Sequence, residues 1–252
     1  MNNPMLYPVG CFPAMEYAAQ ALEYQGYAVA KEPMPDVTHV LLPVPSFEED
    51  GSIKGGGSLK ELLDSVPQDA VIFGGNLDRP ELANYLSKDF LRDPRYLAEN
   101  AAITAHCAVC IAMEKLPVTL LECPALVIGW GRIGKCLASL LKALGANVTI
   151  AARKEADRAM AHGLGYSAVD IQGLSFSLIR YRVVFNTVPA PVLGEEQMVC
   201  CRKDAVKIDL ASVPGMAGDD VIQARGLPGK MAPEASGKLI ARTAIRLIRK
   251  KE

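Results

Sequence analysis

The residues Gly129–Gly134 carry the strongest chemical signal in the sequence, reading Gly-Trp-Gly-Arg-Ile-Gly. They follow the apolar run Ala125–Ile128 and open a segment whose apolar residues recur at helical spacing. In such a strand–turn–helix setting the first glycine permits a tight turn, the second leaves room for a diphosphate, and the third lets helix and strand pack closely. The helix N-terminus then offers unpaired N–H groups to an anion. The alternative is a glycine-rich turn without a ligand. The predicted dinucleotide-binding residues of this turn are Gly129, Gly131, Arg132, Ile133 and Gly134.

The end of the next strand-like run, Val148–Ala151, indicates which dinucleotide is bound. An acidic residue about 20 positions after the first glycine would bind the ribose 2′-hydroxyl of NAD. This region instead contains Arg153 and Lys154, and no acid precedes Glu155. A guanidinium can clamp a phosphate in a bidentate way. Arg153 and Lys154 therefore predict NADP as the cofactor, with NAD as the alternative.

Two further turns follow strand-like runs of the same region. One follows Val183–Phe185 and the other follows Val206–Leu210. Because ligands of open α/β sheets lie outside the carboxyl ends of the strands, we expect both turns to contact the nicotinamide half of the cofactor. The alternative is that these residue types are simply turn formers. The predicted contact residues are Asn186, Thr187, Val188, Pro189, Ser212 and Pro214.

Candidate substrate-binding residues lie in the first half of the chain and before its last helix. Ser46 follows the run His39–Val44. Gly74 and Gly75 follow the run Ala70–Phe73, where bare backbone N–H groups suit a carboxylate, and Arg79 lies close behind. We expect Met231 and Ala232 to face the nicotinamide.

His106 is the candidate catalytic residue. It lies in an otherwise apolar segment, where a histidine acts either as a general acid or base or as an ordinary core residue.

Strand-like runs alternate with helical segments through most of the chain, which is typical of an α/β fold with parallel sheets. The predicted helices cover Met15–Gln25, Ser58–Ser65, Tyr96–Leu116 and Pro233–Glu252. We predict a doubly wound Rossmann sheet, a smaller N-terminal α/β domain, a cleft between them, and a C-terminal helix that packs back at the junction. The predicted boundaries are 1–95 for the substrate-side domain, 96–118 for an interdomain helix, 119–226 for the Rossmann NAD(P)-binding domain and 227–252 for the C-terminal crossover helix.

The composition of the chain limits the classes of function that we expect for the protein. The 252 residues include 27 Lys and Arg against 28 Asp and Glu, a net charge of −1 that excludes a strongly electrostatic nucleic-acid binder. Neither a secretory signal nor an uncharged apolar run of about 18 residues is evident, so we expect a cytoplasmic protein without a membrane partner. Cys107 and Cys110 lack a second pair with ligand spacing, so we expect reduced thiols among the seven cysteines and no metal site.

Several of these segments together resemble the A subunit family of dipicolinate synthase. The resemblance is carried by residues 127–153, 185–193, 207–215 and 227–237, and more weakly by 41–53, 73–77 and 100–112. The family consists of dinucleotide-dependent oxidoreductases of spore-forming bacteria. The resemblance implies a role in sporulation, oxidation of dihydrodipicolinate or a related cyclic dicarboxylate by hydride transfer to NADP, and partnership with a flavoprotein B subunit. We also expect a homo-oligomer.

Two other functions stay open. One is another NADP-linked dehydrogenase of the shikimate or 2-hydroxy-acid type. A hydroxy-acid enzyme commonly uses a histidine late in the nucleotide domain, whereas no histidine follows His162, and Lys60 with Asp64 is an unconvincing shikimate-type pair. The other is a non-catalytic NADP(H)-binding sensor or subunit, because the N-terminal half diverges from the family pattern.

Overall fold

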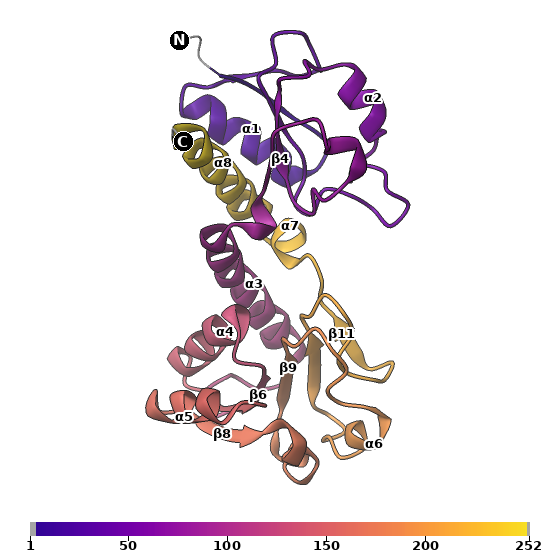
Figure 1. The fold of residues 1–252 in the computed structure, drawn as a ribbon. Coiled ribbons are helices and arrows are strands. Elements are labelled where there is room, and N and C mark those ends of the chain that lie inside the picture. The colour runs from indigo at the N-terminus through magenta and orange to yellow at the C-terminus, as the bar shows by residue number, and fades with distance from the viewer. Residues whose placement is uncertain (1–3, 251–252) are drawn as a thin grey trace. The chain divides into compact units, whose positions relative to one another are not determined.

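The computed structural model describes residues 4–250, so the ends of the predicted outer segments, 1–3 and 251–252, lie outside the described residues. The chain forms two compact units, which are described one at a time (Figure 1). The first unit runs up to Asn100 and resumes from Pro228, and the second unit covers Ala101–Leu227. Each unit is built on a parallel sheet with alternating helices, which confirms the predicted α/β, Rossmann-like fold class.

The first unit contains a five-stranded parallel sheet in the order β2-β1-β3-β4-β5. In this order the direction of winding reverses between β1 and β3, and ligands of such sheets bind outside the carboxyl ends of the strands at that point. The loops that follow β1 and β3 therefore mark the edge where a ligand of this unit is expected. The strands are β1 (Met5–Pro8), β2 (Ala28–Val29), β3 (His39–Leu41), β4 (Val71–Gly74) and β5 (Ser87–Asp89).

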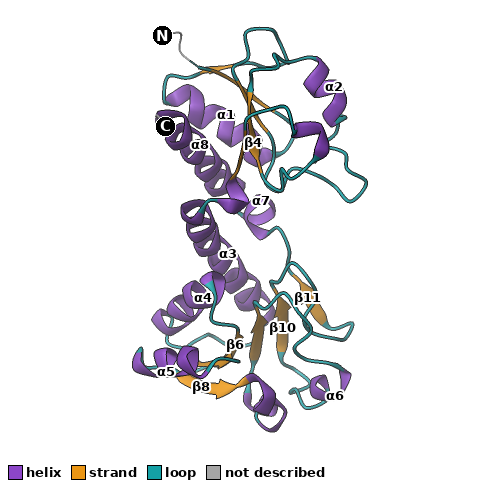
Figure 2. Ribbon diagram, in the orientation of Figure 1, coloured by secondary structure: helices purple, strands orange, loops and turns teal. Residues whose placement is uncertain are grey.

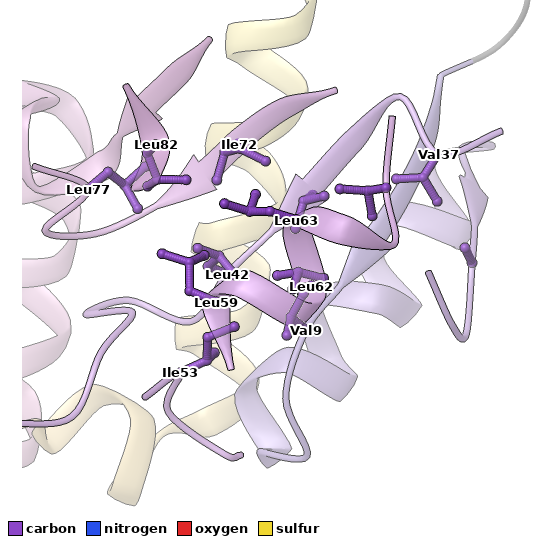
Figure 3. Packing of buried hydrophobic residues seen from close by; sticks show 13 residues of the cluster. Val9, Val37, Leu42, Ile53, Leu59, Leu62, Leu63, Ile72, Leu77 and Leu82 are labelled. Carbon is purple, nitrogen blue, oxygen red and sulfur yellow. The ribbon is translucent and has the colours of Figure 1, made fainter. Parts of the chain in front are cut away.

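The helices of this unit pack on the sheet in two separate groups, α2 in one and α1 with α8 in the other. The short helix α2 (Leu59–Asp64) inserts Leu59, Leu62 and Leu63 into a cluster with Val40, Leu42 and Ile72, and the labelled side chains converge in Figure 3. Helix α1 (Pro13–Tyr24) packs on β1 and β2, and α8 (Pro233–Arg249) packs on α1. The last helix of the chain therefore belongs to the first unit. Short 3-10 turns complete the unit at Pro80–Leu82 and Phe90–Arg92.

Helix α3 (Pro94–Lys115) is the longest helix and starts two residues before the predicted position. Asp93 caps it, because its carboxylate accepts a hydrogen bond of 2.8 Å from the Tyr96 N–H. By length and composition alone α3 is apolar enough to cross a membrane, a test that buried helices of soluble proteins also pass. Its small side chains Ala101, Ala105, Ala108 and Ala112 recur every three or four residues and are buried, as in a packed core helix.

The second unit contains a six-stranded parallel sheet in the order β11-β10-β9-β6-β7-β8 (Figure 2). Counted from its own first strand, this is the order 3-2-1-4-5-6 of the dinucleotide-binding doubly wound fold. The strands are β6 (Pro124–Ile128), β7 (Asn147–Ala152), β8 (Ser167–Asp170), β9 (Val183–Asn186), β10 (Val206–Asp209) and β11 (Val221–Gln223). Its helices are α4 (Arg132–Ala143), α5 (Glu155–Gly163) and α6 (Glu195–Met198), with 3-10 turns at Ile171–Phe176 and Leu178–Arg180. The short helix α7 (Leu227–Met231) begins at the last residue of this unit, and its other residues belong to the first unit.

Candidate functional site

The turn between β6 and α4 requires glycine at two positions, because neighbouring atoms leave no room for a side chain there. Gly129 has a φ of 105°, and a Cβ on it would overlap the hydroxyl of Thr187. A Cβ on Gly134 would overlap the carbonyl oxygen of Gly129. The turn is also tied to the sheet, since the Gly129 N–H donates to the Ala151 carbonyl at 2.8 Å. These contacts match the packing roles predicted for the first and third glycines.

Gly131 differs from Gly129 and Gly134, the other two glycines of the turn, because packing within the protein does not require a glycine at position 131. Its φ is −80°, and a Cβ built on it would meet no atom within 4 Å. Gly131 is also the N-cap of α4, and no side chain caps the first turn of this helix. Unpaired N–H groups and the positive end of the dipole favour an anion at this position. The open space and the donors together fit the diphosphate of a dinucleotide.

Two loops at the carboxyl ends of β9 and β10 are joined by a buried polar pair. The Asn186 amide donates to the Asp209 carboxylate at 2.9 Å and to the Val188 carbonyl at 3.0 Å. Asp209 also accepts hydrogen bonds from the backbone N–H groups of Gly215 at 2.7 Å and Met216 at 3.1 Å. Both side chains of the pair are fully buried. Asn186 therefore positions these loops with its amide already engaged, and Asp209 is an organising residue that the sequence prediction did not include.

The remaining predicted nicotinamide contacts lie on these two loops. Thr187 and Val188 are half-buried, whereas Pro189, Ser212 and Pro214 are exposed at the loop tips. The Thr187 hydroxyl donates to the Ile128 carbonyl at 2.9 Å, which ties this loop to the end of β6 beside the glycine turn. The structure thus gathers both predicted loops at the same edge of the sheet as Gly129–Gly134.

Arg153 and Lys154 lie directly after β7 and are exposed. Within residues 4–250 the Arg153 guanidinium makes no hydrogen bond or ion pair. A third cation, Arg158, supports the strand end: it donates to the carbonyls of Ala152 and Arg153, each at 2.8 Å, and pairs with Asp170 at 2.8 Å. Sequence reasoning missed Arg158 because it follows one helical turn later and its carboxylate partner lies on the next strand.

Trp130 anchors the glycine turn from the side. Its side chain is only 8% exposed, and its ring meets Tyr166 edge-on with centroids 5.7 Å apart. The Lys135 ammonium lies 5.8 Å from the same ring. The indole N–H is buried and has no hydrogen-bond partner among the described residues. The second residue of the turn is therefore fixed by aromatic packing against the β8 side of the unit.

In the first unit, Ser46 joins the loops that follow β3 and β4. Its buried hydroxyl donates to the Pro43 carbonyl at 2.7 Å and accepts from the Gly75 N–H at 2.9 Å. A Cβ on Gly74 would overlap that hydroxyl. The prediction that the Gly75 N–H is bare is therefore wrong, since Ser46 already engages it. A substrate role for Ser46, Gly74 and Gly75 stays a prediction, and their observed contacts position the loops.

Arg79 is half-buried beside these loops and lies against the loop after β3. Its guanidinium carbon is 4.3 Å from the centre of the Phe47 ring, and its nitrogens lie close to Gly51. Within residues 4–250 no carboxylate pairs with it. The cation–π contact orients the guanidinium, and among residues 4–250 no hydrogen bond or ion pair engages its donors, which is the arrangement that a carboxylate ligand needs.

The remaining predicted site residues are the candidate catalytic histidine and the two residues expected to face the nicotinamide. His106 is exposed on α3, so it is not the buried core histidine of the alternative interpretation. Met231 is exposed at the end of α7, and Ala232 is the half-buried N-cap of α8. Their roles stay predictions. Across the described part of the chain, no group of three or more His, Cys, Asp or Glu side chains is placed to hold a metal ion.

The strand order of the second unit and the glycine turn at its first strand define a Rossmann-like protein with the NAD(P)-binding dehydrogenase fold. Among curated proteins, the chain is similar to the A subunit of dipicolinate synthase from Bacillus subtilis (strain 168), with 27% identity over 237 residues, which cover 86% of this chain and 79% of that protein. The resemblance inferred from the sequence motifs is thereby confirmed. No family model matches the chain.

Solved structures agree with this similarity at the level of fold. The A subunit of dipicolinate synthase from Bacillus halodurans superposes with a TM-score of 0.85 at 21% identity, covering 98% of both chains. A transhydrogenase from Sinorhizobium meliloti superposes with a TM-score of 0.73 at 14% identity, covering 97% of this chain and 93% of that one. Together with the curated relative, these likenesses show that the chain has the fold of NAD(P)-binding dehydrogenases.

Proposed function

We propose that this chain is an NADP-dependent oxidoreductase of the same type as the A subunit of dipicolinate synthase. The observation that carries the proposal is the turn at Gly131, where open space meets the uncapped N-terminus of α4. A side chain would fit there without disturbing the protein, so packing does not require this glycine, and the uncapped start of α4 at the same position supports an anionic ligand. The similarity to dipicolinate synthase supports a redox reaction as the purpose of that ligand.

For the coenzyme we propose NADP rather than NAD. Arg153 and Lys154 follow the strand whose end contacts the adenine ribose in this fold class, and the guanidinium of Arg153 is unpaired among the described residues. Arg158 holds the backbone of this strand end, so the preceding carbonyls are fixed while Arg153 is free to meet a 2′-phosphate. Bound NADP would supply a nicotinamide ring that accepts a hydride.

For the substrate we propose dihydrodipicolinate or a related cyclic dicarboxylate. Formation of an aromatic ring favours loss of hydride, so the protein has mainly to orient the donor carbon and hold two carboxylates. Arg79 is our first candidate for carboxylate binding, since Phe47 orients it and its donors have no partner within the described part of the chain. We assign Ser46, Gly74 and Gly75 to positioning the loops around it, His106 to proton transfer, and Met231 and Ala232 to the nicotinamide side.

We further propose that the chain works with a flavoprotein B subunit, forms a homo-oligomer, and acts in the cytoplasm of a spore-forming cell. These proposals follow from the similarity to dipicolinate synthase. Copurification of a tagged chain with the flavoprotein subunit tests the first, and analytical ultracentrifugation of the chain alone tests the second.

The central experiment is a turnover assay of the purified protein. Dihydrodipicolinate is supplied with NADP⁺ or NAD⁺, with and without the flavoprotein subunit, and reduced coenzyme is followed by absorbance. We expect turnover with NADP⁺ as the preferred acceptor. Tight NADP binding without turnover in any combination would favour the sensor alternative. Turnover with a hydroxy acid and none with dihydrodipicolinate would favour the other dehydrogenase class.

A further inference from the structure

A long open groove lies in the first unit, on the helices rather than at the sheet edge that carries Ser46 and Arg79. Helices α1 and α8 form its sides, and the first turns of α3 close it. Its volume is about 1010 Å³. Tyr17, Ala21 and Ala241 line it, together with Tyr24, whose side chain is 88% exposed. We call this feature the helical groove.

The helical groove is much more cationic than the rest of the molecule. Six cations and two acids line it, and a third acid, Asp93, pairs with one of the cations at 2.8 Å. Three positive charges therefore remain uncompensated (six minus three), although the whole chain carries a net charge of −1. Glu99 is shared between Arg95 at 2.8 Å and Arg242 at 2.9 Å. The cations are Arg95, Lys238, Arg242, Arg246, Arg249 and Lys250.

The spacing of the residues that line the helical groove indicates the shape of a ligand that would fill it. On α1 they are Tyr17, Gln20, Ala21 and Tyr24. On α8 the lining residues from Glu234 to Arg249 fall on one side of the helix at 3.6 residues per turn, apart from Thr243. Each helix thus contributes one continuous face, and a groove between two helices is filled by the side-chain ridge of a third. The 17 residues of α8 span about 25 Å at ~1.5 Å per residue, which matches a helix of between four and five turns.

We propose that the helical groove binds an acidic amphipathic helix of a different protein. The apolar face of such a helix would cover the small and aromatic side chains of the groove, and its carboxylates would meet the surplus cations. The N-terminal end of α8 carries the groove's Glu234 and its C-terminal end carries Arg249 and Lys250, so the acidic residues of the partner concentrate toward the latter.

The charges of the helical groove argue against two other occupants, a second copy of this chain and a nucleic acid. A second copy related by a two-fold axis would place the same cationic surface against itself, and like charges in an interface are unfavourable. A nucleic acid would bring its phosphates against Glu99 and Glu234, which already neutralise part of the groove, and would leave its apolar side chains uncovered. An acidic helix satisfies both the apolar and the cationic parts of the surface.

The test uses a fluorescein-labelled helical peptide of 18 residues, with Leu at positions i, i+3, i+4 and i+7 of each repeat and Glu on both flanks. Its matched control carries Lys at every Glu position. Fluorescence anisotropy is measured with the full-length protein at low and high salt. We expect the acidic peptide to bind, to weaken at least tenfold at high salt, and to bind at least tenfold more tightly than the basic peptide.

Two surface variants locate the binding. Tyr24→Glu and Arg242→Glu should each weaken the acidic peptide at least tenfold, whereas Arg180→Glu, a charge reversal on the exposed surface of the second unit, should not. Thermal melting of all three variants is the control for folding, and we expect each to melt cooperatively like the unchanged protein. The proposal is overturned if the acidic peptide does not bind, if both peptides bind alike, or if the groove variants bind it normally. It is also overturned if ultracentrifugation shows that the groove variants convert a dimer to a monomer, because a second copy would then occupy the groove.

Discussion

At the scale of single residues, a substitution at Gly131 should affect ligand binding much more than the stability of the fold. We expect Gly131→Ala to weaken NADP binding at least tenfold, because the new Cβ enters the space proposed for the diphosphate. The fold should change by no more than about 1 kcal/mol, since a Cβ there has no neighbour and alanine is merely a poorer N-cap than glycine. Titration calorimetry and thermal melting measure the two effects.

Gly173→Ala is the matched control for this prediction. A Cβ on Gly173 would likewise meet no atom within 4 Å, and this residue lies on the 3-10 turn Ile171–Phe176, away from the glycine turn in sequence. NADP affinity should be unchanged in this variant. Equal affinities of Gly131→Ala and the unchanged protein would contradict the assignment of the diphosphate to this turn.

Arg153 decides between the two coenzymes. Removing its guanidinium in Arg153→Ala should weaken NADP binding by about 10- to 150-fold, the equivalent of ~1.5–3 kcal/mol for charge-assisted hydrogen bonds. NAD binding should change little, because NAD lacks the phosphate. The measurement is a pair of dissociation constants for each protein, with Arg180→Ala as a control for the loss of a surface cation. Tighter binding of NAD than of NADP by the unchanged chain would rule out the assignment.

The residue scale also shows why the sequence revealed part of the candidate site and not all of it. The glycine turn was predictable because its strand, turn and helix are contiguous. Asp209 and Arg158 act through partners 23 and 12 residues away. Ser46 likewise meets Gly75 across 29 residues. Pairings of this kind depend on which strands become neighbours, and local spacing carries no such information.

At the scale of elements, the contact between α1 and α8 depends on Gly237. A Cβ there would overlap the Ala14 carbonyl oxygen and lie 2.7 Å from the Tyr17 Cβ. We expect Gly237→Ala to lower the free energy of unfolding by about 1–3 kcal/mol, because the helices must separate to admit the methyl group. Gly229→Ala, at a position with open space, is the control. Urea unfolding measures both, and an unchanged stability of Gly237→Ala would contradict the observed helix contact.

The start of α3 should make stability depend on pH. Burial alone would raise the pKa of the Asp93 carboxyl, but the Tyr96 N–H and the Arg246 guanidinium hold that pKa below its ordinary value. The unfolded chain therefore takes up the proton at higher pH than the folded one. The stabilisation is complete above the unfolded pKa of ~3.9 and is lost as the pH falls through the lower folded value.

Asp93→Asn tests this contribution, because asparagine keeps the N-cap but removes the charge. We expect the variant to be less stable by about 1 kcal/mol at pH 7, with the difference from the unchanged protein shrinking as the pH falls below ~4. Urea unfolding across this range gives the profile. A destabilisation that stays constant down to about pH 2.5, below the ordinary pKa of an aspartate, would indicate that the charge of Asp93 contributes nothing.

Long periodic elements were predictable, and short ones were not. The helices expected over Tyr96–Leu116 and from Pro233 are present as α3 and α8. The strands β2, β5 and β11 span two or three residues each, too few for an alternating pattern to stand out. Strand β1 was also missed, because its prolines and polar neighbours obscured a run of four residues.

At the scale of the whole molecule, the alternation of strands and helices predicted parallel sheets but not their strand orders. Both units reverse their winding near the first strand, with β1 beside β3 and β6 beside β9. That shared feature places the polar loops of each sheet at its carboxyl edge. The chain therefore contains two candidate ligand-binding edges with the same strand arrangement, one with the glycine turn and one with Ser46 and Arg79.

The two units should respond differently to coenzyme, and Trp130, the single tryptophan of the chain, reports on the second unit alone. NADP at about 100 times its dissociation constant should stabilise the unit that binds it by about 2.7 kcal/mol. The unfolding transition followed by Trp130 fluorescence should therefore move to higher temperature or higher urea. At the same NADP concentration Arg153→Ala should lose about half to nine-tenths of this stabilisation, as follows from a 10- to 150-fold weaker affinity, whereas Arg180→Ala should retain it. A Trp130 transition that NADP leaves in place would show that the second unit does not bind the coenzyme.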